Sequence, residues 1–182
     1  FSVEGAESFI MSLKSIVDSM SLYDIDQINI GMPHRGRLNT ICNVLDRPYH
    51  DIFSQFLQKF HGDVNSYGDV KYHLGYENIT KDQKKIKLMM NSSHLESVNP
   101  ILLGFTKYQQ DNNVSACPIL VHGDAAISGQ GIVQECVNMS AINGYNVHGT
   151  IHFIINNQIG FTTTTSEARS SRYCTDIAKS IR

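Results

Sequence analysis

Apolar and polar positions follow two patterns along this chain. Short apolar runs rich in β-branched residues, bounded by Gly, Asn or Pro, are typical of buried parallel strands. Longer segments with apolar residues at helical spacing are typical of amphipathic helices; Phe9, Leu13 and Val17 share one such face. We predict strands at 26–31, 85–91, 118–122 and 150–155, and helices at 4–20, 36–45, 49–60, 97–110, 132–139 and 175–182. A polar surface loop is predicted at 61–68.

The order of these elements predicts the fold class. Strands that alternate with helices favour an α/β fold, a parallel sheet with helices on both faces. With 182 residues and no visible repeat or internal boundary, a single domain spanning 1–182 is expected. Ligands of such sheets bind beyond the carboxyl ends of the strands. Polar residues that follow the predicted strands are therefore the first candidates for function.

Asp124 and Asn157 are the strongest of these candidates. Each follows an apolar run, and they lie 33 positions apart, with one helix length between the two runs. This is the pattern of a β-α-β unit. An Asp oxygen, an Asn oxygen and a nearby backbone carbonyl are hard ligands that suit Mg²⁺ or Ca²⁺, and Mg²⁺ usually completes its octahedron with phosphate and water. An Asp and an Asn in two ordinary turns are the structural alternative.

Glycines support the ligand-binding interpretation. Gly129 and Gly131 precede the predicted helix at 132–139. Glycines at a helix start let a ligand approach the backbone, and the free N–H groups there favour phosphate. Together with the metal ligands, this pattern predicts a diphosphate site.

Three further polar clusters contain histidine. His34, Arg35 and Arg37 follow the strand at 26–31, where they form either an anion clamp or a solvated basic turn. His73 lies in a short polar segment and is either a half-buried structural histidine or a ligand-binding one. Ser93 and Glu96 match a helix capping box, which is at least as good an interpretation as a catalytic one. Two more histidines, His122 and His152, fall within the predicted strands, where we expect core or supporting roles.

Composition narrows the function classes. The net charge of −2 leaves no basic footprint for nucleic acid, and no apolar run is long enough to span a membrane. The four cysteines lack paired spacing, so neither a zinc site nor a disulfide framework is indicated. The chain begins at Phe1 and ends inside an amphipathic pattern, so we expect it to be a fragment of a longer protein.

Several long motifs resemble one family across the whole chain. The chain is similar to the thiamine diphosphate-dependent dehydrogenase component of the 2-oxoglutarate dehydrogenase complex. The motifs that carry this resemblance are, in chain order, FSVEGAESFI, GMPHRGRLN, GDVKYHLG, SHLESVNP, GDAAISGQGIVQE, GTIHFIINNQIGFTT and EARSSRYCTDIAKSI. Their number and common order are far more specific than the Asp–Asn spacing alone.

The resemblance implies a function and assigns roles to residues. The expected reaction is oxidative decarboxylation of 2-oxoglutarate, dependent on thiamine diphosphate and Mg²⁺, with transfer of the succinyl group to a lipoyl-bearing succinyltransferase component in the tricarboxylic acid cycle. Asp124, Asn157 and the carbonyl of Ile159 would hold the metal. Arg35 would contact the diphosphate, and His34 and His73 would bind the substrate.

The resemblance also implies partners and a location. The full-length protein is expected to be a homodimer, in which a Glu from another domain activates the cofactor; we expect that Glu to lie outside this chain, which alone would be inactive. The location would be the mitochondrial matrix in a eukaryote and the cytoplasm in a bacterium. Two alternatives stay open: the same chemistry on 2-oxoadipate or another 2-oxo acid, and a non-catalytic domain that keeps the fold.

Overall fold

A computed structural model of the chain describes residues 2–3, 5–57 and 70–180. Part of the predicted helix at 49–60 and the predicted loop at 61–68 lie outside these residues. The elements are, in chain order, α1 (Glu7–Asp18), the 3-10 helix η1 (Met20–Tyr23), β1 (Gln27–Gly31), α2 (Arg37–Asn43), α3 (Tyr49–Leu57), β2 (Tyr76–Ile79), β3 (Lys85–Leu88), α4 (Val98–Asp111), β4 (Ala116–Gly123), α5 (Asp124–Gly129), α6 (Gly131–Met139), β5 (Ile151–Ile155), β6 (Ile159–Gly160), β7 (Thr163–Thr164), α7 (Thr165–Ala168) and the 3-10 helix η3 (Cys174–Ser180).

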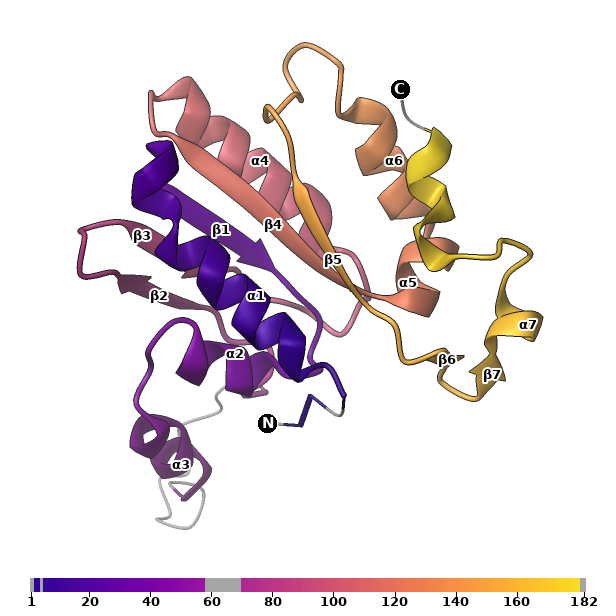
Figure 1. The fold of residues 1–182 in the computed structure, drawn as a ribbon, viewed down its shortest axis with the longest axis horizontal. Helices are drawn as coiled ribbons and strands as arrows, with labels where there is room; N and C mark the ends of the chain where they lie inside the picture. The colour runs from indigo at the N-terminus through magenta and orange to yellow at the C-terminus, as the bar shows by residue number, and fades with distance from the viewer. Residues whose placement is uncertain (1, 4, 58–69, 181–182) are drawn as a thin grey trace.

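A five-stranded sheet in the order β2-β3-β1-β4-β5 forms the centre of the molecule (Figure 1). The four strands from β3 to β5 are parallel, which confirms the predicted α/β class. The edge strand β2 was not predicted, and it pairs with β3 in the antiparallel direction. Only residues 80–84 separate β2 from β3, and so short a connection joins antiparallel strands, whereas parallel strands need a long crossover.

Helices cover both faces of the sheet, as predicted (Figure 1). Ile28 and Ile30 of β1 belong to the main buried core, which they share with apolar residues of α1. The intervening residues face α4. Asn29 donates a hydrogen bond of 3.0 Å to Thr106, and a Cβ atom on Gly31 would lie only 3.1 Å from Leu102. The alternation of side chains along a strand thus places α1 and α4 on opposite faces.

Other differences from the predicted elements are local. The short helix α5 begins at once after β4, where a turn was expected, and the C-terminal helical segment is a 3-10 helix instead of an α-helix. Helix α5, with six residues, is too short to show a helical period in the sequence, and the seven residues of η3 are too few to distinguish a 3-10 helix from an α-helix. None of the helices in the described part of the chain combines the length and hydrophobicity that a bilayer crossing requires.

Candidate active site

A cavity of about 300 Å³ lies at the carboxyl ends of β1, β4 and β5. This is where a parallel sheet is expected to bind its ligands. Five of the six candidate residues line it: His34, Arg35, Asp124, Asn157 and Ile159. The sixth, His73, lies behind His34 and does not line the cavity. The fold therefore brings together residues that are more than 120 positions apart in the sequence.

Asp124 is the most deeply buried charged group that lines the cavity. It is the first residue of α5, and only 1% of its surface is exposed. Arg169 donates a hydrogen bond from Nη1 to Asp124 Oδ2 at 3.3 Å. A carboxylate in such a place needs a cation or several donors, because desolvation disfavours the charged form. Its other oxygen, Oδ1, faces Asn157.

The side-chain amide of Asn157 joins the two remaining candidate ligands. In the orientation that satisfies its hydrogen bonds, its nitrogen donates to Asp124 Oδ1 and to the carbonyl oxygen of Ile159, both at 3.1 Å. Its oxygen then accepts from Arg35 Nη2 at 3.3 Å. If the amide turns over, its oxygen takes the place of the nitrogen. The amide oxygen would then lie 3.1 Å from Asp124 Oδ1, which is charged, and 3.1 Å from the carbonyl oxygen of Ile159.

The spacing of these atoms fits Mg²⁺. With metal–oxygen distances of about 2.1 Å, neighbouring ligands in an octahedron are about 3 Å apart. The 3.1 Å distances from the Asn157 amide to Asp124 and Ile159 match that edge. The described residues, this site included, contain no group of three His, Cys, Asp or Glu side chains that could hold a metal, so a metal here would depend on the amide and carbonyl oxygens. One carboxylate with two neutral oxygens is a donor set for a hard cation whose other positions go to phosphate and water.

His34 and His73 lie side by side, with ring centroids 5.1 Å apart. His34 Nε2 is buried without a hydrogen-bond partner, although the residue lines the cavity. Burial, followed by the nearby His73 and Arg37, lowers the pKa of His34, so its ring is neutral at pH 7. His73 Nε2 is 3.2 Å from Ser93 Oγ. An unpartnered ring nitrogen at a cavity wall is suited to hydrogen-bond a polar ligand.

Arg37 has a role that the sequence did not reveal. Its side chain is fully buried, and it donates hydrogen bonds to the carbonyls of Met32, Leu74 and Met89. Burial lowers its pKa to about 10, so the guanidinium keeps its charge. By joining these three segments it fixes the loops of His34 and His73 against each other. No local signal distinguishes it from Arg35, because the burial of a side chain depends on distant segments.

The predicted capping box of Ser93 and Glu96 is wrong. Helix α4 begins at Val98, Ser97 is its N-cap residue, and no side chain caps it. Glu96 has a φ of 67°, a backbone conformation that turns the chain and directs its carboxylate inward. That carboxylate lies 2.6 Å from Nδ1 of His122. A local motif had suggested a cap, but a contact with β4 decided where the Glu96 side chain lies.

Comparisons with known proteins all lead to one family. The family model described as "Dehydrogenase E1 component" matches residues 15–182. The oxoglutarate dehydrogenase of Buchnera aphidicola subsp. Baizongia pistaciae (strain Bp) is 47% identical over 190 residues, which cover 100% of this chain and 21% of that protein. The multifunctional 2-oxoglutarate metabolism enzyme of Mycobacterium sp. (strain JLS) is 43% identical over 195 residues, covering 100% of this chain and 15% of that enzyme.

A third relative, the multifunctional 2-oxoglutarate metabolism enzyme of Mycolicibacterium vanbaalenii, is also 43% identical over 195 residues, covering 100% of this chain and 16% of its own length. The chain thus spans about a fifth or less of the length of these relatives. Both the family match and the identities extend over nearly all of the sequence. The chain therefore belongs to the dehydrogenase E1 component family.

Proposed function

We propose that this chain forms the diphosphate- and metal-binding domain of a longer enzyme that decarboxylates 2-oxoglutarate oxidatively. The E1 family is thiamine diphosphate-dependent, and the relatives at 43–47% identity carry oxoglutarate or 2-oxoglutarate in their names. The enzyme would transfer the succinyl group to the lipoyl group of a succinyltransferase component in the tricarboxylic acid cycle. It would be an oxidoreductase and, at full length, a homodimer.

The observation that carries this proposal is the convergence of Asp124, Asn157 and Ile159 at 3.1 Å spacing. These three residues would hold Mg²⁺ against the diphosphate, with Arg35 as a second cation for the phosphate oxygens. When bound, thiamine diphosphate supplies the carbon nucleophile and accepts the electrons released with carbon dioxide. The chain would neutralise the charge of the diphosphate, hold the cofactor in position and exclude water from the cavity.

His34 would bind the substrate. Its neutral ring can donate one hydrogen bond, and its buried Nε2 has no partner within the chain. A hydrogen-bond donor fixed at a cavity wall stabilises negative charge that develops on a substrate oxygen. The ring of His73 lies next to that of His34, and Ser93 is within hydrogen-bond distance of His73. His34 and His73 together would favour a substrate with a second carboxylate over one without it.

Location and substrate range follow as parts of the same proposal. The relatives named above are bacterial, and for a bacterial source we propose the cytoplasm. The mitochondrial matrix applies only to a eukaryotic source.

Rates of carbon dioxide release from 2-oxoglutarate, 2-oxoadipate and pyruvate by the full-length protein would rank the possible substrates. Release from none of them, with cofactor and Mg²⁺ present, would favour a non-catalytic domain.

The metal site itself is tested by Asp124→Asn in the full-length protein. We expect this variant to lose the Mg²⁺-dependent part of thiamine diphosphate binding, measured by titration calorimetry with Mg²⁺ and with EDTA. Asp111→Asn is the control, because Asp111 pairs with Lys107 on α4, away from the cavity. Wild-type affinity in Asp124→Asn would rule out the metal assignment.

A further inference from the structure

Arg169 contacts the wall of the candidate active site but does not line the cavity. Its guanidinium donates a hydrogen bond from Nη1 to Asp124 Oδ2 at 3.3 Å, and only 10% of its side chain is exposed. Nε of Arg169 is buried and has no hydrogen-bond partner in the part of the chain that the structure describes. The charge of this arginine therefore acts on Asp124, and not on a ligand in the cavity.

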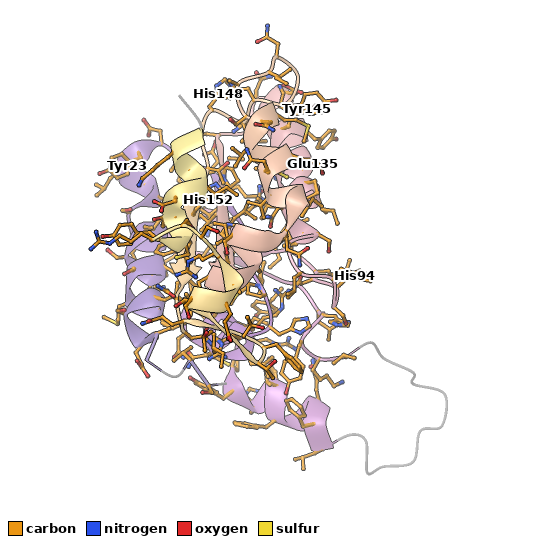
Figure 2. The ribbon with its side chains drawn as sticks, turned by 90° about the vertical axis from the view of Figure 1, so that its right-hand side faces the viewer. Tyr23, His94, Glu135, Tyr145, His148 and His152 are labelled. Carbon is orange, nitrogen blue, oxygen red and sulfur yellow. The ribbon has the colours of Figure 1, made fainter. Side chains whose placement is uncertain are left out.

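The segment that carries Arg169 packs against the helix that begins with Asp124. Arg169 directly follows α7, and its backbone N–H donates to the carbonyl of Thr165 at 3.2 Å. In the same segment, β6 approaches α5 so closely that a Cβ atom on Gly160 would lie 2.8 Å from Cβ of Ala125. Figure 2 shows the side of the molecule on which α7 lies, with its ribbon in yellow. Packing thus fixes the guanidinium beside one oxygen of Asp124.

The two carboxylate oxygens of Asp124 have different partners. Oδ2 accepts the hydrogen bond from Arg169. Oδ1 lies 3.1 Å from the side-chain nitrogen of Asn157, whose place the amide oxygen would take in the metal site. Only Oδ1 is therefore directed towards the other two candidate ligands. A carboxylate held in this way offers a metal ion one oxygen, so it binds as a monodentate ligand.

The number of oxygens that a carboxylate offers distinguishes the two hard cations that the sequence left open. Mg²⁺ requires a nearly ideal octahedron with metal–oxygen distances of about 2.0–2.1 Å. Ca²⁺ takes six to eight oxygens at about 2.3–2.6 Å and readily binds both oxygens of one carboxylate. Two oxygens of one carboxylate lie too close together to occupy neighbouring corners of a regular octahedron. Keeping Asp124 Oδ2 away from the ion therefore disfavours Ca²⁺ more than Mg²⁺.

We propose that Arg169 makes the metal site selective for Mg²⁺ over Ca²⁺, because it holds Asp124 in the monodentate orientation. The inference depends on the proposed function, which supplies the diphosphate and the metal. Arg169 is a positioning residue: it acts through Asp124 and touches neither substrate nor cofactor. Its positive charge also repels a metal ion, but that repulsion is common to both cations. The ratio of the two affinities therefore isolates the effect of geometry.

Arg169→Gln in the full-length protein tests the proposal. Titration calorimetry with saturating thiamine diphosphate gives the affinity for Mg²⁺ and, separately, for Ca²⁺. We expect the Mg²⁺-to-Ca²⁺ affinity ratio to fall about 10-fold, since a residue that orients a metal ligand typically contributes 10–100-fold to metal affinity. Arg169→Lys keeps a cationic donor and should give a ratio between those of Arg169→Gln and the wild type. Arg172→Gln removes the same charge from an exposed position of the same segment and should keep the wild-type ratio.

The outcomes separate this selectivity from the function on which it depends. A wild-type ratio in Arg169→Gln, or an equal change in the affinities for both cations, would overturn the role of Arg169 and leave the proposed function standing. If Arg169→Gln does not fold, Arg169→Lys decides: a ratio below that of the wild type supports the proposal, and an unchanged ratio overturns it. A wild-type protein whose thiamine diphosphate binding depends on neither cation would overturn the proposed function, and this inference with it.

Discussion

Arg169 and Asp124 form a nearly buried ion pair, with Arg169 Nη1 3.3 Å from Asp124 Oδ2 and only 10% of the Arg169 side chain exposed. The two residues are 45 positions apart, and Arg169 follows helix α7, beyond the short strands β6 and β7. The guanidinium thus neutralises the carboxylate to which we assign a metal. The metal ion would contact the same carboxylate, so Arg169 and the metal would together neutralise the one negative charge of Asp124.

This pairing predicts that Arg169→Gln destabilises the protein mainly in the absence of metal. Removing one partner of a buried pair leaves an uncompensated charge and costs about 3 kcal/mol. With Mg²⁺ and thiamine diphosphate bound, the metal would compensate Asp124, and the loss should shrink. Scanning calorimetry of the full-length protein in EDTA and in cofactor with Mg²⁺ measures the difference. Lys179→Gln, which removes the exposed partner of an i,i+3 pair with Asp176, should cost little in either buffer. An equal loss in both buffers would contradict the shared role.

Substrate choice is predicted to depend on His34 and His73. A hydrogen bond to a charged group contributes about 1.5–3 kcal/mol, so His34→Ala or His73→Ala should lower kcat/KM for 2-oxoglutarate by roughly one to two orders of magnitude. The loss should be small for a monocarboxylic oxo acid, and cofactor affinity should barely change. Steady-state kinetics with both substrates give the comparison, and His50→Ala, on the exposed surface of α3, is the control. Equal losses for both substrates would show that these histidines do not select the distal carboxylate.

Arg37 is predicted to be essential for the shape of the site although it does not line the cavity. Arg37→Lys keeps the positive charge but lacks the planar guanidinium, whose two terminal nitrogens donate to the carbonyls of Met32, Leu74 and Met89. We expect a loss of about 3 kcal/mol in stability, since each hydrogen bond from a charged donor contributes about 1.5–3 kcal/mol. Denaturant unfolding of the full-length protein measures it. Arg172→Lys, at an exposed position, serves as the reference. A variant as stable as that reference would show that the buried guanidinium does not hold these segments together.

A pH dependence is predicted for His152. His152 lies on the exposed edge strand β5, but desolvation of its ring, one face of which stacks on His122, and then the charge of His122 lower its pKa to about 4, while Glu96 acts in the opposite direction. Above pH 6.5 the ring is neutral in the folded and unfolded states and has no effect on stability. As the pH falls from 6.5 towards 4, the unfolded state binds the proton more readily, so the free energy of unfolding decreases; below pH 4 the effect is constant. His152→Gln should flatten the stability curve of the full-length protein in that window. Curves for the two proteins that run parallel between pH 6.5 and 4 would exclude this contribution.

The sequence by itself determined the strands that build the site. The apolar runs that became β1, β4 and β5 were predicted to within two residues at each end. The strands β1 and β4 are buried on both faces and need an unbroken run of apolar side chains, and the half-buried edge strand β5 has a similar run. The positions of Asp124 and Asn157 after two of these strands were sufficient to predict that both would meet at one edge of the sheet. The pattern of the chain and its family motifs thus identified five residues that line one cavity.

Only the tertiary structure decided which partners the polar side chains have. Arg35 and Arg37 are two residues apart in one basic turn, yet the first lies at the cavity and the second is buried among backbone carbonyls. Glu96 matched a helix cap and instead contacts His122, and nothing near Arg169 in the sequence indicated that it would pair with Asp124. Hydrophobic periodicity is a local property of the chain, whereas the partner of a buried charge is set by whichever distant segment packs against it.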